Sequence, residues 1–423
     1  MGVVTDVNRT IEAIWRIEQA KLIASLARMV RDVGLAEELA QDALEAALKT
    51  WPQAGVPDRP GAWLMAVAKR RALDTLRRDA MLKRKHAEIG RDLDEAQTPD
   101  LEAALDQEIG DDLLRLMFVS CHPVLSKEAR AALTLRLIGG LSTEEIARAF
   151  LVAEPTIAQR ITRAKKTLAE KQIPFEVPRG AALAERLSSV LEVIYLIFNE
   201  GYAATAGDDW MRPQLCEDAL RLGRILAELA PLEPETHGLA ALMEIQASRL
   251  HARVNASGEP VLLMDQDRAR WDRLLIRRGL AALERAEAAA RAVRISLGPY
   301  ALQAAIAACH ARAQTPTDTD WPRIAALYAE LMTASPSPVV ELNRAVAVSM
   351  AEGPAAGLAL VDTLNDEPSL QGYHLLPAVR ADLLRKLGRL AEARAEFNRA
   401  AALTRNARER DLLLGRAAAC GDA

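Results

Sequence analysis

Residues 142–168 have the residue types and spacing of a helix-turn-helix that could read DNA. Ser142 and Glu145 have capping-box spacing, and Pro155 suits the first position of the next helix. On that second helix, apolar residues recur every three or four positions: Ile157, Ile161, Ala164 and Leu168. Its opposite face carries polar residues, namely Thr156, Gln159, Arg160, Arg163 and Lys166. One face would pack on the partner helix while the other enters the major groove.

The polar face divides by chemistry into base-reading and phosphate-binding candidates. Arg160 or Gln159 could bond to base edges, whereas Arg163, Lys165 and Lys166 suit phosphate contacts. Two packed helices of another function can show the same pattern, so the motif alone leaves DNA binding and plain packing both open.

A second basic segment lies at residues 60–79. An apolar face repeats every four residues: Leu64, Ala68, Ala72 and Leu76. The far side carries Arg70, Asp74, Arg77 and Arg78, and Trp63 stands at the head of the helix. An aromatic ring beside a cationic stripe suits stacking on unpaired bases, with the arginines on the phosphates. The alternative for Trp63 is core packing, the commoner fate of a tryptophan.

Upstream, residues 34–51 place acidic and apolar residues on separate stripes. The acidic stripe is Glu38, Asp42 and Glu45, and the apolar stripe is Ala40, Leu44, Ala47 and Trp51. The acidic stripe is either a solvated helix face or a docking surface for a basic partner helix. The sequence alone does not choose between them.

Composition predicts an all-α protein of several domains. The chain has 423 residues, half of them apolar and only 4% aromatic, and alanine, leucine and arginine dominate. The net charge is −4, but residues 69–85 hold eight Lys/Arg against two Asp, which suggests a local nucleic-acid footprint. No stretch approaches eighteen uncharged apolar residues, and the four isolated cysteines have no metal-ligand spacing. We therefore expect a cytoplasmic protein without membrane span, metal or cofactor, and no motif indicates an enzyme.

Breaks in composition divide the chain into five predicted segments. An acidic, proline-containing linker separates two helical groups, and a break with two prolines at 173–180 begins a third region. Near the end, Gly388, Ala393, Phe397 and Ala400 have the spacing of a tetratricopeptide helix pair, and Tyr328 and Pro336 suggest an earlier unit. The predicted boundaries are 1–86, 87–110 (linker), 111–173, 174–290, and 291–423 for the tetratricopeptide-like repeats.

In order, these segments resemble the extracytoplasmic-function sigma factors of bacterial RNA polymerase over roughly residues 10–173. AEELAQDALEAALKTW is similar to region 2.2, PGAWLMAVAKRRALDTLRR to regions 2.3 and 2.4, and LSTEEIARAFLVAEPTIAQRITRAKKTLAEK to region 4.2. The resemblance implies a promoter-specificity subunit whose first domain docks on the polymerase β′ subunit and melts the −10 element. Its second domain would read the −35 element and touch the β subunit.

Carried over residue by residue, the resemblance assigns three sets of contacts. Core-polymerase docking falls to Glu38, Gln41 and Asp42; −10 binding to Trp63, Arg70, Arg71, Asp74, Arg77 and Arg78; and −35 binding to Thr156, Gln159, Arg160, Arg163 and Lys165. The chain departs from the family at Glu154 and Pro155, where a glycine is frequent. A carboxylate there would repel a phosphate, complement the helix dipole or accept from a cytosine amino group, and these alternatives imply different −35 sequences.

Residues 187–420 resemble the extension of a sigma subgroup with a C-terminal tetratricopeptide-like domain, thought to regulate the sigma part. IYLIFNEGYAAT, LMDQDRARWD, GPYALQAAIAACHA and SPVVELNRAVAV carry this resemblance. Inside it, a charged cluster is either a network that locks a turn or a pocket for a ligand or protein partner. The cluster comprises Asp265, Asp267, Arg268, Arg270, Trp271 and Asp272.

Two other function classes compete with the sigma interpretation. A conventional helix-turn-helix repressor or activator would bind duplex DNA without polymerase, but it leaves Trp63 and the acidic stripe unexplained. A repeat scaffold would bind partners through residues 291–423, with its basic helices incidental.

Overall fold

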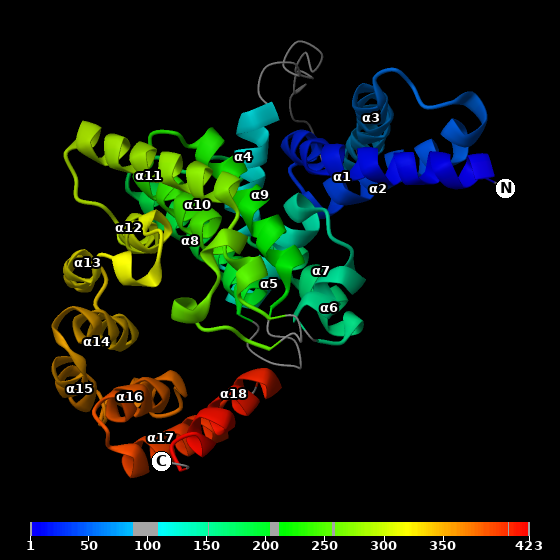
Figure 1. The fold of residues 1–423 in the computed structure, drawn as a ribbon. Helices are drawn as coiled ribbons and strands as arrows, with labels where there is room; N and C mark the ends of the chain where they lie inside the picture. Colours follow the sequence, from blue (N-terminus) through cyan, green and yellow to red (C-terminus); the bar gives the residue numbers. More distant parts are fainter. Residues whose placement is uncertain are drawn as a thin grey trace. The chain divides into compact units, whose positions relative to one another are not determined.

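The computed structural model describes residues 2–87, 109–150, 152–203, 211–255, 259–404 and 406–421, and these form helices and turns (Figure 1). The predicted all-α class is confirmed. Within the described ranges no strand occurs, only an isolated bridge between Val254 and Pro260. The chain divides into two compact units, Met1–Val193 and Ile194–Ala423. Most of the predicted linker, 88–108, lies outside the described residues.

Three helices begin the first unit: α1 (Gly2–Val30), α2 (Val33–Ala54) and α3 (Pro60–Ala87). Asp32 starts α2, because its carboxylate accepts from the Leu35 amide at 2.9 Å. Gly55 ends α2 with φ of 84°, a conformation that glycine adopts without a steric penalty. The facing sides bury Leu26, Trp51 and Leu64, each at most 1% exposed.

The first unit continues with α4 (Ile109–Ser120), α5 (Lys127–Thr134), a π-helical turn at Leu135–Gly139, α6 (Thr143–Phe150) and α7 (Glu154–Glu170). After the non-helical break at 173–180, α8 (Ala181–Tyr202) begins. Arg186 donates to the Phe118 carbonyl at 2.5 Å, and Ser189 donates to the Cys121 carbonyl at 2.6 Å. Ser189 also accepts from Arg130 of α5, so the first half of α8 packs on α4 and α5 as part of the first unit.

In the first part of the second unit, α10 (Pro234–Ala247) is the central helix. It packs against α9 (Pro213–Leu229), α11 (Arg273–Val293) and α12 (Pro299–Arg312). The Glu235 carboxylate accepts from the amides of Tyr300 and Ala301 at 2.8 and 3.1 Å, which caps α12. Burial raises the pKa of Glu235, and the two amide bonds oppose that rise. Gly238 brings α10 close to α12, since a Cβ there would lie 2.6 Å from the Ala301 nitrogen.

The remaining helices pack in chain order: α13 (Trp321–Ala334), α14 (Pro338–Glu352), α15 (Pro354–Asp362), α16 (Leu375–Lys386), α17 (Leu390–Leu403) and α18 (Ala407–Ala418). Gly388 has φ of 76° in the turn between α16 and α17. Ala393, Phe397 and Ala400 of α17 are fully buried. The helix pair predicted from their spacing is present, while the tetratricopeptide assignment remains a prediction.

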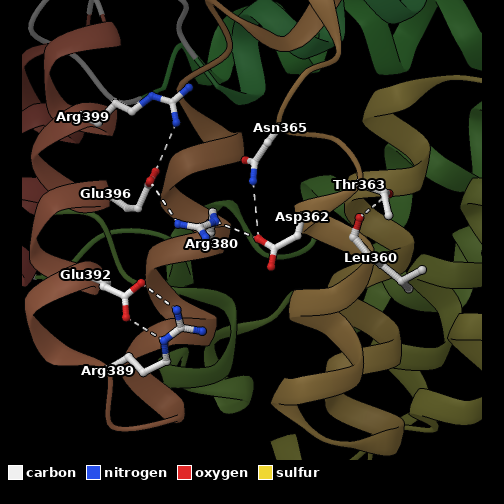
Figure 2. Close-up of polar contacts among 9 residues, drawn as sticks. All are labelled: Leu360, Asp362, Thr363, Asn365, Arg380, Arg389, Glu392, Glu396 and Arg399. Atoms are coloured by element: carbon white, nitrogen blue, oxygen red, sulfur yellow. Dashed lines mark hydrogen bonds and ion pairs between the residues drawn. The ribbon is translucent and has the colours of Figure 1, made fainter.

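An ion-pair chain joins α15, α16 and α17 (Figure 2). Arg380 on α16 donates to Asp362 at 2.9 Å and to Glu396 at 3.2 Å. Glu396 also pairs with Arg399, and Arg389 forms a bidentate pair with Glu392. Arg380 is 19% exposed and spans two neighbours, so it links three helices more effectively than an isolated surface pair would.

The charged cluster at 265–272 agrees with the turn-locking interpretation. Arg268 is 6% exposed and donates to the carbonyls of His310 and Ala313 at 2.6 and 2.7 Å. Trp271 is buried, with the Arg268 guanidinium 5.0 Å from its ring centroid. The Asp272 carboxylate caps α11. The contacts of Arg268 and Asp272 are with the fold itself.

Candidate nucleic-acid interface

The helix-turn-helix is built as its sequence predicts. The Ser142 amide donates to the Glu145 carboxylate at 2.7 Å, and the Glu145 amide donates to the Ser142 hydroxyl at 3.0 Å. This reciprocal capping box starts α6. Helix α7 begins at Glu154, so Pro155 occupies its second position, one later than predicted. The predicted apolar stripe of α7 is buried, with all four members at most 6% exposed.

The polar face of α7 borders a hollow shared with α5. Its volume is about 350 Å³. Four of the five predicted −35 residues line it, together with Ser126 and Ala129: Thr156, Gln159, Arg160 and Arg163. Arg160 also interacts electrostatically with Glu128, whose pKa is lowered chiefly by hydrogen bonds at the start of α5. The structure therefore brings these four side chains together on one accessible, polar surface.

Lys165, the fifth predicted −35 residue, lies on a different side of α7. Its ammonium forms an ion pair with Glu37 of α2, which is 4% exposed. Glu37 also accepts from Arg136 Nε at 2.7 Å and from Gln41 at 3.1 Å. Arg136 in turn accepts at its backbone carbonyl from Gln19 of α1 at 3.0 Å. A buried carboxylate thus connects the α1–α3 group with the helix-turn-helix group.

Glu37 and Arg136 were not among the predicted site residues. The missed signal was Glu37 itself, which lies on the buried stripe of α2 between Val33 and Ala40. A carboxylate within an apolar stripe needs a cation, because an unpaired buried charge is costly. Its partners lie about 100 and 128 positions away in the chain, so local spacing could not identify them.

Helix α3 places its predicted residues in different environments. Leu64, Ala68 and Ala72 are buried, and Leu76 is half-buried. Trp63 is half-buried and packs edge-on against Trp51, with ring centroids 5.3 Å apart. Trp63 therefore takes part in core packing while keeping some surface accessible.

The predicted charged residues of α3 lie at its surface. Arg70, Asp74, Arg77 and Arg78 are exposed, and Arg78 donates to the Asp74 backbone carbonyl at 3.4 Å. Arg71 pairs with Asp42 of α2 at 2.8 Å, and their side chains are 40% and 49% exposed. This pair joins a predicted −10 residue to a predicted polymerase-docking residue.

The acidic face of α2 has two further predicted residues, Glu38 and Gln41, and both are exposed. Glu45, on the same face, pairs with Lys49 at 2.5 Å. This pair lowers the pKa of Glu45, first through the hydrogen bond and then through the charge of Lys49. On this face Asp42 and Glu45 are paired with Arg71 and Lys49, while Glu38 and Gln41 are exposed and Gln41 donates to Glu37.

The described residues contain no cluster of His, Cys, Asp or Glu that could hold a metal ion. Cys121 and Cys216 are buried, and burial raises their pKa to about 11 and about 12. Such thiols are protonated at neutral pH and poor nucleophiles. Among the described helices, none is long and apolar enough to cross a membrane.

Three segments match known protein families. Residues 15–81 match sigma-70 region 2, residues 115–168 match sigma-70 region 4, and residues 186–287 match a family of unknown function, DUF6596. The two sigma matches include all of the predicted polymerase- and DNA-contacting residues. The third match begins within α8 and ends within α11.

Similar proteins extend over different parts of the chain. The uncharacterized protein R00370 of Rhizobium meliloti is 46% identical over 391 residues, which cover 92% of this chain and 90% of that protein. The probable ECF RNA polymerase sigma factor SigI of Mycobacterium tuberculosis is 29% identical over 168 residues, 40% of this chain and 57% of SigI. The ECF RNA polymerase sigma factor SigK of Mycobacterium ulcerans is 30% identical over 149 residues, 34% of this chain and 75% of SigK.

No solved structure matches the chain. Regions 2 and 4 occur in the family's order, the helix-turn-helix is intact, and the rest of the described chain is helical. The chain therefore belongs to the sigma-70 family of RNA polymerase sigma factors, in its extracytoplasmic-function group, with a helical C-terminal extension.

Proposed function

We propose that this sigma factor directs RNA polymerase to a specific promoter set by reading the −35 element with the polar face of α7. The observation that carries the proposal is the hollow lined by Thr156, Gln159, Arg160 and Arg163, beside the buried stripe of α7. Arg160 and Gln159 have side chains that bond bidentately to guanine and adenine edges. Arg163 is exposed and binds phosphate in this scheme.

For the −10 element, we propose that α3 holds the unpaired strand. Arg70, Arg77 and Arg78 are exposed and bind its phosphates. Trp63 offers the accessible part of its ring for stacking, while Trp51 fixes its orientation from the buried side. Arg71 also binds a phosphate after it releases Asp42. The Asp74 carboxylate accepts hydrogen bonds from amino groups of the unpaired bases.

For the polymerase core, we propose that the acidic face of α2 docks on the β′ subunit. Glu38 and Gln41 are exposed, and Asp42 becomes available when Arg71 turns to DNA. Region 4 contacts the β subunit in the same scheme. Exposed carboxylates of this kind steer association and fix orientation more than they add affinity.

Arg160→Ala tests the −35 assignment in transcription by polymerase core with the full chain. If Arg160 reads a base, its loss weakens initiation by about 1–3 kcal/mol and relaxes specificity at one promoter position. The matched control is Lys166→Ala, since Lys166 is 73% exposed and pairs only loosely with Glu170 at 3.6 Å. The control weakens all promoters alike.

Two results would contradict this function. If Arg160→Ala reduced initiation equally on all promoters with altered −35 elements, Arg160 would be a phosphate contact and would not read a base. Tight duplex binding by the protein alone, with no initiation when core is added, would indicate a conventional helix-turn-helix regulator.

We further propose that the C-terminal extension regulates the sigma part. The support is its size, since the second unit is larger than the first, and its continuity with region 4 through α8. A truncation at Pro174 would remove Arg186 and Ser189, which bind α4 and the turn after it. A chain ending at Tyr202 keeps those contacts and is the better test. Equal initiation by this chain and the full chain would refute regulation.

A further inference from the structure

A hollow of about 650 Å³ lies between α9, α10 and α11 in the second unit. Its walls carry Arg224 from α9 and Arg278 and Arg285 from α11, and its floor includes His237 and Glu244 from α10. Alanines of all three helices line the space between these groups, so short side chains leave it open. Its size is typical of small-molecule sites, and it falls within the match to the family of unknown function.

The floor contains two buried polar groups, each with one atom that lacks a hydrogen-bond partner. Glu244 is 4% exposed; its Oε1 accepts from Arg224 Nε at 2.7 Å, and its Oε2 has no hydrogen-bond partner. His237 is 6% exposed, and its Nε2 lies 2.9 Å from the Pro231 carbonyl. Because a carbonyl only accepts, Nε2 carries the proton, and Nδ1 of the neutral ring is a second acceptor without a donor.

The α11 wall presents two cations without counterions. Arg278 and Arg285 are exposed, seven positions apart on one side of α11, about 10 Å along its axis. Neither guanidinium has an ion pair or hydrogen bond within the described chain. Arg224 pairs with Glu244 and remains 41% exposed. Guanidinium groups bind phosphate and carboxylate bidentately, so this wall suits an anion.

We propose that this hollow binds a small molecule that carries both an anionic group and a hydrogen-bond donor. The anion, phosphate or carboxylate, pairs with Arg278 and Arg285. The donor, an ammonium or hydroxyl group, reaches Glu244 Oε2 and His237 Nδ1 on the floor. A molecule with only one of these features leaves either the cations or the buried acceptors unpaired. The proposal concerns binding alone and stands whether or not the extension regulates transcription.

Calorimetric titration of the full chain with phosphoserine tests the site, because phosphoserine carries a phosphate and an ammonium group. Inorganic phosphate is the anion-only probe. We expect saturable binding of phosphoserine, at least about tenfold tighter than phosphate, which corresponds to one charge-assisted hydrogen bond. The double variant Arg278→Ala/Arg285→Ala abolishes binding of both probes. Arg277→Ala, which removes an exposed arginine outside the hollow on the same helix, leaves binding unchanged.

The Glu244→Gln variant tests the floor, because a neutral amide oxygen accepts a weaker hydrogen bond from an ammonium group than a carboxylate oxygen does. We expect the preference for phosphoserine over phosphate to shrink while phosphate binding persists. If Glu244→Gln fails to fold, the double variant Arg278→Ala/Arg285→Ala still tests the site, because both of its changes lie at the surface. Absence of saturable binding at millimolar phosphoserine, equal affinity for both probes, or binding that survives the double arginine variant would each overturn the proposal.

Discussion

The ion-pair cluster around Glu37 leads to a direct test of how the first unit is held together. Glu37→Gln keeps the side-chain shape and one carbonyl acceptor but removes the charge that faces Lys165 and Arg136. Two cations then lie together without their shared carboxylate. We expect a large loss of stability, because the altered group is buried and its partners come from α7 and the turn after α5.

The magnitude follows from burial. Removing one partner of a buried ion pair costs about 3–5 kcal/mol. Arg136 and Lys165 keep 23% and 24% of their side-chain surface, so water relieves part of the repulsion and the lower end, about 3 kcal/mol, applies. In a unit of this size each 1 kcal/mol lowers the Tm by about 2–4 °C, which gives about 6–12 °C.

Differential scanning calorimetry of the full chain measures this shift in the transition of the first unit. The control is Glu38→Gln, the neighbouring exposed carboxylate, which should move the Tm by about 1 °C or less because surface changes of this kind are small. A double-mutant cycle with Lys165→Met isolates the Glu37–Lys165 term. If Glu37→Gln lowers the Tm no more than Glu38→Gln does, the cluster does not stabilise the unit and the reasoning fails.

Three further variants test the second unit. Phe397→Ala removes a fully buried ring beside Arg416 and should lower the free energy of unfolding by about 3–5 kcal/mol, measured by urea titration. Gly238→Ala should cost about 1–3 kcal/mol, because its methyl group meets the backbone of Ala301; an unchanged urea midpoint would contradict that close approach. Burial, followed by the charges of Arg249 and Arg268, lowers the pKa of His310 from 6.5 to about 4. Because the folded-state pKa is lowered, the neutral ring stabilises the fold above pH 6.5, and this contribution is lost as pH falls towards 4. His310→Gln should therefore flatten the urea midpoint against pH over that interval.

Local features of the fold were predictable because their causes are local. The capping box at Ser142 and the α7 stripe depend on neighbouring members at most four positions apart along a helix. The position of Lys165 was not predictable in the same way. Its place in the polar sequence suggested DNA, which stays a prediction, and the structure adds an ion pair with Glu37 of another helix group that the local sequence did not indicate. The hollow below Arg278 was also missed, since it forms only when the consecutive helices α9, α10 and α11 pack together, and helical periodicity does not give that packing.

The charged cluster at 265–272 illustrates the converse. Its composition left a turn-locking network and a pocket both open, and the Arg268 guanidinium faces the carbonyls that end α12, as the network interpretation expects. Both terminal nitrogens of this guanidinium donate to the fold itself, while its Nε has no hydrogen-bond partner. In the hollow of α9–α11, by contrast, Arg278 and Arg285 have no partner in the described chain.

Helix α2 forms one ion pair with each predicted DNA-contacting helix: Asp42 with Arg71 of α3, and Glu37 with Lys165 of α7. Promoter binding would disturb these two pairs to different extents. Asp42 and Arg71 are both about half exposed, and such pairs contribute about 0–1 kcal/mol, so a phosphate can replace Asp42 without moving a helix. Glu37 is buried between α2 and α7, and Lys165 cannot leave it without exposing an otherwise buried carboxylate. Under the proposed function, −10 contacts by Arg71 can form on the structure as it stands. A phosphate contact by Lys165 requires it to give up its ion pair with Glu37, so Glu37→Gln should free Lys165 and raise the salt dependence of −35 duplex binding by about one phosphate contact.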